Sequence, residues 1–510
     1  MMKIRLIIFL MATILYNITM SGQGGLRPRG DVNCDWEVTI ADVNILLDSV
    51  MSGAKYHSYY TYSLDVNGDR EITIADINLL IDAILGGELP PMPSYSVTLP
   101  VLFINTEGHR DIVSKEDYLH ADWWLDNMGN DEYESLGSPE YPLGMRIRGR
   151  GNYTWTNHEK KPFRLKLDYP LSILGMPPSH HWVLLSGADY WIGQINDMLP
   201  FEIGRQMGMS WNPRQVPIEV VLNGQYIGLY HLTENIHVDV NRVNIVKQKD
   251  NETDSTLVTG GWLMEIDNYY EPNQIAFTEG NGWPFWVTPH SPEELSSVQR
   301  TYITNFLMQA DCAIYCKNKI STQWEHYIDI DSLAVFYIIQ EIMDNAEGFH
   351  GSCYFHKHRG DSTKLIFGPL WDFGSAFSRY TDTYEFNHFI YDNASSNLHL
   401  RWIAEIAKYP RFQLCVRQHW QRFYHDIYPQ LDQLLDEYGD KIEAACDCDY
   451  KRWPKSECNN IKNRINFTRN RCLNKKIAWL QSQWGWPVPV DPEGPQSKDI
   501  NKPKGKVTTP

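Results

Sequence analysis

The chain has 510 residues, which is more than one hydrophobic core usually supports, so we expect two or more domains. Its formal net charge of −17 argues against binding of nucleic acid through phosphate contacts, which need clustered lysine and arginine. The 18 tryptophans and 29 tyrosines exclude a disordered chain.

Residues 1–23 have the three regions of a secretory signal peptide. Lys3 and Arg5 precede an apolar run at 6–18, and the small residue Ser21 follows it. The run is too short to span a bilayer, and no later stretch is long and apolar enough. The sequence therefore predicts a secreted protein, extracellular, cell-surface or periplasmic, with no transmembrane segment after signal removal.

An internal repeat follows, because residues 31–42 recur as residues 65–76. Each copy precedes apolar residues at helical spacing. Calcium is a hard cation, and EF-hand loops surround it with side-chain and carbonyl oxygens at alternate positions and at the last residue. The predicted ligands are Asp31, Asn33, Asp35, Thr39 and Asp42, then Asp65, Asn67, Asp69, Thr73 and Asp76, with the carbonyls of Glu37 and Glu71.

The paired loops with their single helices resemble the type I dockerin family, whose loops also end in aspartate and lack an entering helix. The resemblance implies a small all-α module at residues 31–87 that is folded by Ca²⁺ and that binds a cohesin-like partner. A Pro-rich linker is predicted at 88–94, and a disordered tail at 487–510.

Between residues 95 and 486 the sequence predicts mainly antiparallel strands first and helices afterwards, with helical spacing at 295–315 and 398–483. Residues 145–168 predict a hairpin, because apolar and polar residues alternate in its second strand. Residues 218–234 predict two strands around an Asn-Gly turn, with Glu234 at the end of the second.

Three further segments place acids beside apolar elements. Glu265 and Asp267 lie on the same side of a predicted strand. Residues 340–352 end an apolar helix pattern in a polar loop, and residues 365–374 place Asp372 after an apolar strand. Each segment therefore brings a carboxylate to the end of a buried element.

Five blocks in this order resemble the spore coat protein H (CotH) kinase family over residues 95–486. The blocks are Arg-Gly-Arg-Gly-Asn at 148–152 with Lys-Lys-Pro-Phe-Arg-Leu-Lys-Leu at 160–167, the strand pair ending at Glu234, the segment at 260–267, the loop at 340–352, and Gly-Pro-Leu-Trp-Asp-Phe-Gly at 368–374. The resemblance implies an overall α+β fold, with the small all-α module followed by a large divergent (atypical) kinase-like domain. It also implies a secreted enzyme that transfers the γ-phosphoryl group of ATP, with Mg²⁺ or Mn²⁺, to Ser or Thr of a protein acceptor.

Phosphoryl transfer needs cations on the phosphates, an acid that orients a lysine, a carboxylate on the metal and another near the attacking hydroxyl. By resemblance, Lys161 or Lys166 contacts the phosphates with Arg148 beside them, Glu234 orients the lysine, Glu265 and Asp267 lie at the nucleotide's edge, and Asp372 holds the metal. The base stays open between Glu347 and Asp344, because this chain has Asn345-Ala-Glu347 where relatives carry a shorter acid after the asparagine.

A second interpretation is a catalytically inactive CotH-like protein that binds or builds a cell-surface or extracellular, polysaccharide-related assembly. Glu347 favours it, and so does Asn196, which stands where relatives often have arginine. A carbohydrate-active enzyme would need a pair of carboxylates facing a groove, and no spacing indicates such a pair. Nine cysteines in an exported chain permit disulfides.

Overall fold

The computed structural model describes residues 30–33, 37–52, 64, 66, 72–87, 95–96, 98–188, 193–267, 271–280, 282, 284–392, 401–454, 456 and 458–485. The predicted signal peptide, linker and tail lie outside these residues. So do five of the predicted calcium ligands: Asp35, Asp65, Asn67, Asp69 and the carbonyl of Glu71.

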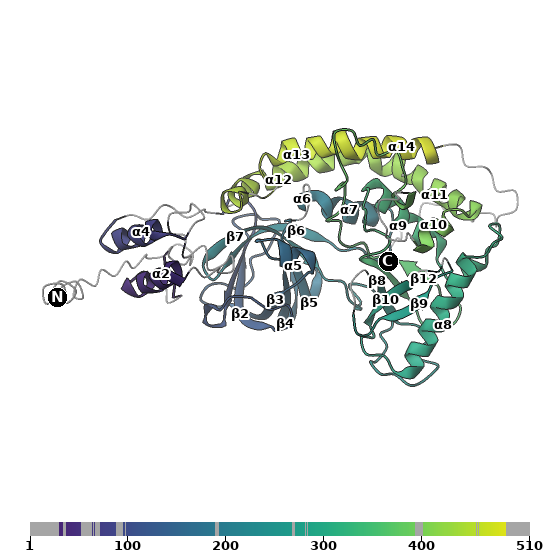
Figure 1. Ribbon diagram of the computed structural model, residues 1–510, viewed down its shortest axis with the longest axis horizontal. Coiled ribbons are helices and arrows are strands. Elements are labelled where there is room, and N and C mark those ends of the chain that lie inside the picture. The colour runs from purple at the N-terminus through teal and green to yellow at the C-terminus, as the bar shows by residue number, and fades with distance from the viewer. Residues whose placement is uncertain are drawn as a thin grey trace, which may run out of the picture.

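The N-terminal module consists of α2 (Ile40–Ser52) and α4 (Ile74–Ile84), which pack against each other (Figure 1). Their facing apolar residues share a small core, which comprises Val32, Val43, Leu46, Leu64, Val66, Ile77 and Leu80. Thr73 begins α4 with a capping box to Asp76, and Gly86 follows its end with a φ of 102°. The helices predicted after each loop are thus confirmed.

Seven strands form a closed barrel in the order β1-β2-β3-β4-β5-β7-β6. They are β1 (Val101–Thr106), β2 (Leu119–Asp126), β3 (Leu143–Gly149), β4 (Phe163–Ile173), β5 (Met176–Leu185), β6 (Gln215–Leu222) and β7 (Gln225–Glu234). All pairs are antiparallel except β1 with β6, which closes the barrel. Both predicted hairpins are confirmed: β3 pairs with β4, and β6 with β7 across Asn223 and Gly224, which both have positive φ.

A second sheet has the order β12-β11-β8-β10-β9. Its strands are β8 (Trp262–Ile266), β9 (Ile275–Thr278), β10 (Pro284–Ser291), β11 (Cys353–Lys357) and β12 (Leu365–Phe367). The apolar strand predicted before Asp372 is confirmed as β12, whereas β11 was not predicted. Strands β11 and β12 return after two helices and pair beside β8.

Helices cover the second sheet and continue over the barrel (Figure 1). The longer ones are α7 (Met198–Gln206), α8 (Ser297–Ile314), α9 (Ile330–Ile342), α11 (Pro410–Arg422), α12 (Leu431–Arg452), α13 (Ile461–Thr468) and α14 (Asn474–Trp484). Short elements are η1 (Glu107–His109), α5 (Tyr153–Asn157), α6 (Gly193–Asn196), η2 (Gln323–His326), η3 (Ile390–Asp392), α10 (Arg401–Ile406), η4 (Phe423–Ile427), η5 (Tyr428–Gln430) and η6 (Arg469–Leu473). Within the described part of the chain, no helix is both long and apolar enough for a bilayer.

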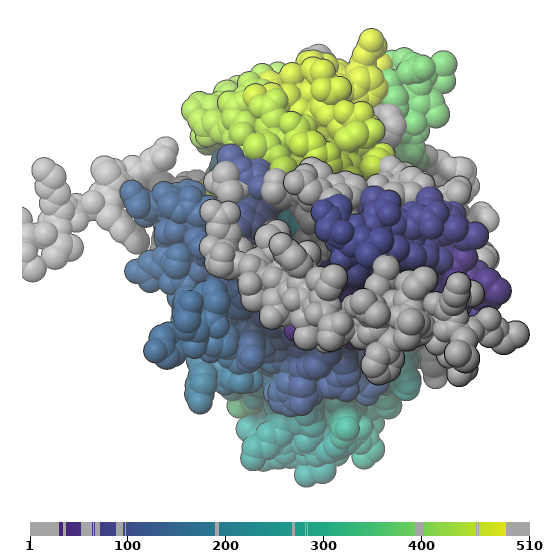
Figure 2. Space-filling view, turned by 90° about the vertical axis from the view of Figure 1, so that its left-hand side faces the viewer, coloured from purple at the N-terminus to yellow at the C-terminus, as the bar shows by residue number. Residues whose placement is uncertain are grey.

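Buried ion pairs attach the C-terminal helices, which form the yellow upper layer in Figures 1 and 2, to the rest of the domain. The ammonium of Lys160 lies 2.5 Å from the carboxylate of Asp449 on α12, and the same carboxylate accepts the amide of Leu229 in β7. On α14, the ammonium of Lys476 lies 3.1 Å from Glu341 and 3.2 Å from Asp344. The α12–α14 layer thus contacts both the barrel and the central helix α9.

Candidate functional site

Asp372 lies in the loop after β12, beside acids from three other segments. Protein atoms surround its carboxyl closely enough that burial raises its pKa, with Arg150 acting against the shift and Glu265 adding to it. The residue nevertheless keeps its solvent access. The hydroxyl of Ser352 donates to the Asp372 carboxylate over 3.4 Å.

Asp197 and Glu347 complete an acidic cluster with Asp372. Burial raises the pKa of Asp197 to about 6, and Asp372 adds to the shift. The Asp197 carboxylate accepts the amide of Phe373 over 3.0 Å, which fixes it beside the Asp372 loop. Burial and the charge of Asp372 also raise the pKa of Glu347, which remains exposed. We call Asp197, Glu347 and Asp372 the acidic cluster.

The backbone is strained at the acidic cluster. Ser352 and Asp372 have φ values of 48° and 60°, in a region that L-residues with a Cβ seldom adopt. Such strain concentrates at functional sites, where the surrounding structure holds it in place.

Asp344 lies away from the acidic cluster. Its side chain is fully buried and contacts Lys476 at 3.2 Å, the hydroxyl of Tyr384 at 3.2 Å and Arg379 at 3.7 Å. A catalytic base must reach an incoming hydroxyl. Because these contacts enclose Asp344, the structure contradicts its prediction as the base and leaves Glu347.

Two of the predicted phosphate contacts point elsewhere. Arg148 donates to the carbonyl of Lys115 and lies 3.6 Å from Glu116, whereas Lys161 donates to the carbonyl of Trp155 over 2.5 Å. The cation that reaches the acidic cluster is Arg150, whose guanidinium lies 5.6 Å from the ring centre of Trp371 and acts on the pKa of Asp372.

Glu234 is buried at the end of β7, as predicted, but its partner is not a lysine. Arg242 lies 2.8 Å from one carboxylate oxygen, and Arg214 lies 3.4 Å from the other. Glu234 therefore anchors two arginines, and its predicted pairing with a lysine, Lys161 or Lys166, is wrong.

Lys166 belongs to a basic face on the outside of the barrel. Phe163, Leu165 and Leu167 fill the barrel core, so Arg164 and Lys166, which alternate with them, lie on the outer side. Burial and the nearby charges of His237, Arg164 and Lys166 lower the pKa of His181 to about 3. We call Arg150, Arg164 and Lys166 the basic face, beside which His181 is neutral.

The Nε of Arg164 is buried and has no hydrogen-bond partner among the described residues. Buried donors are usually paired, so this guanidinium has capacity for an anion. Burial and the charge of Arg150 lower the pKa of Arg164, and the same charge opposes the rise in the pKa of Asp372. Arg150 therefore lies near both groups and connects the basic face with the acidic cluster.

Glu265 and Asp267 were predicted to share one side of a strand. Both acids raise the pKa of the same two neighbours, His290 and Tyr354. The carboxylate of Glu265 lies 2.6 Å from Nε2 of His290. Burial opposes protonation of His290, but Glu265, Asp267 and Glu293 outweigh it and raise its pKa. Both acids also raise the pKa of Tyr354, after burial. This polar group adjoins Asp372, whose pKa Glu265 raises.

Sequence reasoning missed Arg150, Asp197, His290, Ser352 and Tyr354. Arg150 stands in the same Arg-Gly-Arg-Gly block as Arg148, and Ser352 ends the quoted loop at 340–352. The blocks at 148–152 and 340–352 therefore already contained two of the missed residues, whereas nothing in the local sequence distinguishes His290 and Tyr354.

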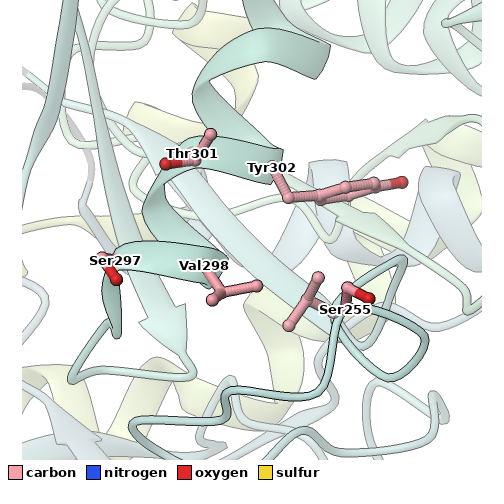
Figure 3. A pocket seen from close by; sticks show the side chains of 6 residues that line it. Ser255, Ser297, Val298, Thr301 and Tyr302 are labelled. Carbon is pink, nitrogen blue, oxygen red and sulfur yellow. The ribbon is translucent and has the colours of Figure 1, made fainter.

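A separate pocket of about 370 Å³ lies at the N-terminal end of α8 (Figure 3). Its lining consists of Ser255, Val258, Ser297, Val298, Thr301 and Tyr302. It contains no carboxylate or cationic side chain. The pocket therefore lacks the groups for phosphoryl transfer and is not part of the candidate site.

The described calcium-loop acids are turned inward. Asp31, Asp42 and Asp76 are fully buried. One carboxylate oxygen of Asp42 accepts the amides of Val32 and Asn33, and the other accepts the amide of Thr39. Buried carboxylates with oxygen-bearing neighbours fit a hard cation such as Ca²⁺.

The described cysteines, Cys312, Cys316, Cys353, Cys415, Cys446, Cys448, Cys458 and Cys472, are all free thiols. The disulfides that the sequence permits are thus not formed among the residues that the structure describes.

Comparison with protein families identifies both parts of the chain. The family model described as CotH kinase protein matches residues 146–474, which is more than half of the chain, so the chain belongs to this family. The model described as dockerin type I domain matches residues 29–85. Dockerin domains of this type bind calcium and cohesins and occur in extracellular or cell-surface proteins. A search of curated proteins found no match.

Proposed function

We propose that the CotH domain transfers the γ-phosphoryl group of ATP to a Ser or Thr hydroxyl of a protein outside the cytoplasm, and that the dockerin module docks the enzyme to a cohesin-like partner through Ca²⁺. The observation that carries the proposal is the adjacency of the basic face and the acidic cluster, with Arg150 between them. Phosphoryl transfer depends on this combination of cations and metal-binding carboxylates.

The proposed roles follow from the chemistry of each side chain. Arg150, Arg164 and Lys166 neutralise phosphate oxygens. Asp372, with Asp197 beside it, would hold Mg²⁺ or Mn²⁺, since these hard cations prefer carboxylate oxygens. The metal supplies charge neutralisation on the phosphates.

Glu347 is proposed as the base. The acceptor oxygen forms a bond to the γ-phosphorus, the bond from that phosphorus to the bridging oxygen breaks, ADP leaves, and the hydroxyl proton passes to Glu347. A carboxylate with a raised pKa takes this proton more readily than an ordinary one.

The spacing of Glu347 and Ser352 supports a kinase-like arrangement. In the catalytic loop of protein kinases, H-R-D-x-x-x-x-N, the base and a metal-binding asparagine have the same separation. Here serine stands in the asparagine's place and its hydroxyl donates to Asp372. This difference favours the second candidate function, a family member that binds nucleotide without transferring phosphate.

The test uses the full chain in Ca²⁺ with Mg²⁺ or Mn²⁺ and γ-labelled ATP. We expect label on the chain itself or on a generic acceptor, and a thermal shift with nucleotide. Asp372→Asn should abolish both signals. Asp382→Asn, an exposed aspartate on the following segment, is the matched control and should change neither.

Two outcomes of this experiment would overturn the proposed kinase activity. A nucleotide-dependent shift without transfer overturns the kinase in favour of the nucleotide-binding protein. The absence of both signals from the wild-type chain overturns both.

A further inference from the structure

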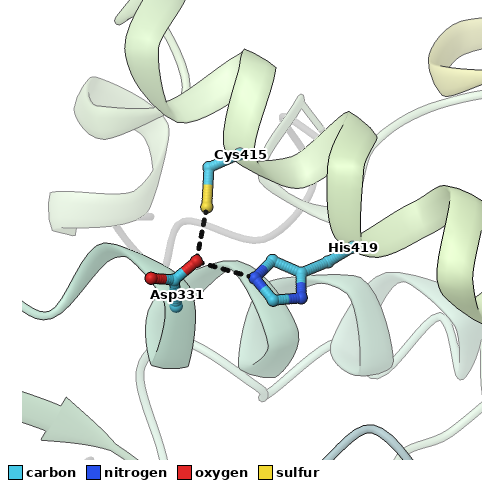
Figure 4. A group of neighbouring side chains, drawn as sticks. All are labelled: Asp331, Cys415 and His419. Atoms are coloured by element: carbon cyan, nitrogen blue, oxygen red, sulfur yellow. Dashed lines mark hydrogen bonds and ion pairs between the residues drawn. The ribbon is translucent and has the colours of Figure 1, made fainter. Parts of the chain in front are cut away.

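Three side chains far from the acidic cluster bring sulfur, nitrogen and oxygen to one point on the surface. Asp331 lies in the first turn of α9, and Cys415 and His419 lie on α11, which packs against α9 (Figure 4). Their nearest ligand atoms all lie within 4.8 Å of one another. Cys415 and His419 are one helical turn apart and share a face of α11.

The separations suit a tetrahedral metal. One Asp331 oxygen lies 2.9 Å from Nε2 of His419 and 3.4 Å from Sγ of Cys415. Zinc binds oxygen and nitrogen at about 2.0–2.2 Å and sulfur at about 2.3 Å, so ligand atoms on a zinc tetrahedron are roughly 3.5 Å apart. Small side-chain rotations would therefore place all three ligands around one ion.

The connections exclude a nucleophilic triad. In such a triad the histidine contacts the nucleophile and the acid contacts the histidine. Here the thiol donates to Asp331 and to the carbonyl of Ile330, so Asp331 stands between the other two groups. Burial also raises the pKa of the Cys415 thiol, which disfavours a free thiolate.

The surrounding charges favour a cation. A second carboxylate, Glu325, lies near Asp331: burial raises its pKa and the charge of Asp331 adds to the rise. Its Oε1 is buried without a hydrogen-bond partner in the described part of the chain. Arg411, 3.9 Å from the other oxygen of Glu325, and Lys364, which opposes the rise in the pKa of Glu325, are nearby cations that oppose a metal. Asp329 adds a third carboxylate near Cys415, so three carboxylates and two cations leave one negative charge before the thiol is ionised.

We propose that Asp331, Cys415 and His419 bind a zinc ion, with the fourth position open to water or to an external ligand. Binding ionises Cys415, whose proton passes to the solvent, and displaces the hydrogen bonds that Asp331 accepts. Cys415 is buried, whereas the side chain of Asp331 is 70% exposed, so the ion reaches the site from the surface. The site lies outside the candidate phosphoryl-transfer site.

The test is titration of the chelator-treated full chain with Co²⁺ and then Zn²⁺, with Ca²⁺ in excess to fill the dockerin loops. A cobalt–thiolate bond gives a charge-transfer band in the near ultraviolet. We expect one equivalent of this band, its loss on addition of Zn²⁺, and its absence from Cys415→Ser. Cys312→Ser, which removes an exposed thiol on α8, is the control and should keep the band.

Two results overturn the proposal: no band in the wild-type chain, or a full band in Cys415→Ser. If Cys415→Ser fails to fold, Asp331→Asn provides the test, because this residue is exposed and its replacement leaves the buried thiol in place. The affinity for Co²⁺ should then fall at least about ten-fold. An unchanged affinity overturns the site.

Discussion

Burial raises the pKa of the Asp197 carboxyl from 3.8 to about 6. The native state therefore binds this proton more tightly than the unfolded state, and the ionised carboxyl increasingly opposes folding as the pH rises from about 4 through about 6. Asp197→Asn removes the charge and keeps an acceptor for the amide of Phe373. We expect it to raise the free energy of unfolding at pH 7 by about 1–3 kcal/mol and to change it little at pH 4. Urea unfolding at both pH values measures this, and an equal change at both would contradict it.

Glu347 gives a second prediction at the same scale, which rests on the proposed function. Glu347→Gln keeps the size of the side chain but cannot accept a proton, so transfer should fall at least about 100-fold while the nucleotide thermal shift persists. Glu347→Asp restores a carboxylate and should retain more activity than Gln. Initial rates with labelled ATP decide the matter, and a Gln variant as active as wild type would exclude Glu347 as the base.

Individual site residues were only partly predictable from the sequence. Asp372 and Glu347 stand at the ends of apolar elements, and the structure brings them together. The choice between Arg148 and Arg150, however, depends on which one contacts the Asp372 loop, a contact between segments far apart in sequence. Lys160 and Lys161 are neighbours with the same side chain, and the sequence cannot tell which one is buried. Only the ion pair with the distant Asp449 identifies Lys160 as the buried one.

The buried ion pairs of Lys476 attach α14 to α9, and they yield a prediction at the scale of elements. Lys476 is fully buried between Glu341 and Asp344, and burial raises the pKa of Glu341 to about 7 despite this ammonium. Lys476→Met leaves the buried Glu341 without its cation and leaves Asp344 with Arg379 at 3.7 Å, so we expect a loss of about 3–5 kcal/mol in unfolding free energy at pH 8.

The loss should be smaller at pH 5, because the pH then lies below the raised pKa of Glu341 and its protonation removes the unpaired charge. Denaturant unfolding at both pH values measures it. Lys475→Met is the matched control, since this neighbour is partly exposed and lies 3.8 Å from Glu385 at the surface. If both variants lose the same stability, the buried ion pairs of Lys476 do not stabilise the packing of α14 against α9.

Elements defined by local pattern were predictable. Alternation gave β3 and β4, the Asn-Gly pair gave the turn between β6 and β7, and helical spacing gave α8. Strand β11 was not predicted, because it is short and its partner β8 precedes it by two helices. Such pairing depends on tertiary contacts rather than local propensity.

Calcium removal tests the arrangement of the whole molecule. The small core between α2 and α4 cannot compensate for buried acids without a cation, so a chelator should unfold residues 31–87 and leave the melting transition of the large domain in place. Calorimetry with and without chelator measures both transitions. Asp42→Asn should weaken calcium binding, whereas Asp48→Asn on the exposed side of α2 should not. A large domain that melts with the module would contradict this independence.

The ion pairs of Asp449 and Lys476 also determine when the domain can finish folding. During synthesis the barrel strands emerge first, but Lys160 and α9 receive their buried partners only when α12 and α14 have left the ribosome. Until then the chain carries unpaired charges at positions that must become buried, which disfavours a stable early fold. Completion of the large domain therefore waits for the last helices of the chain that the structure describes.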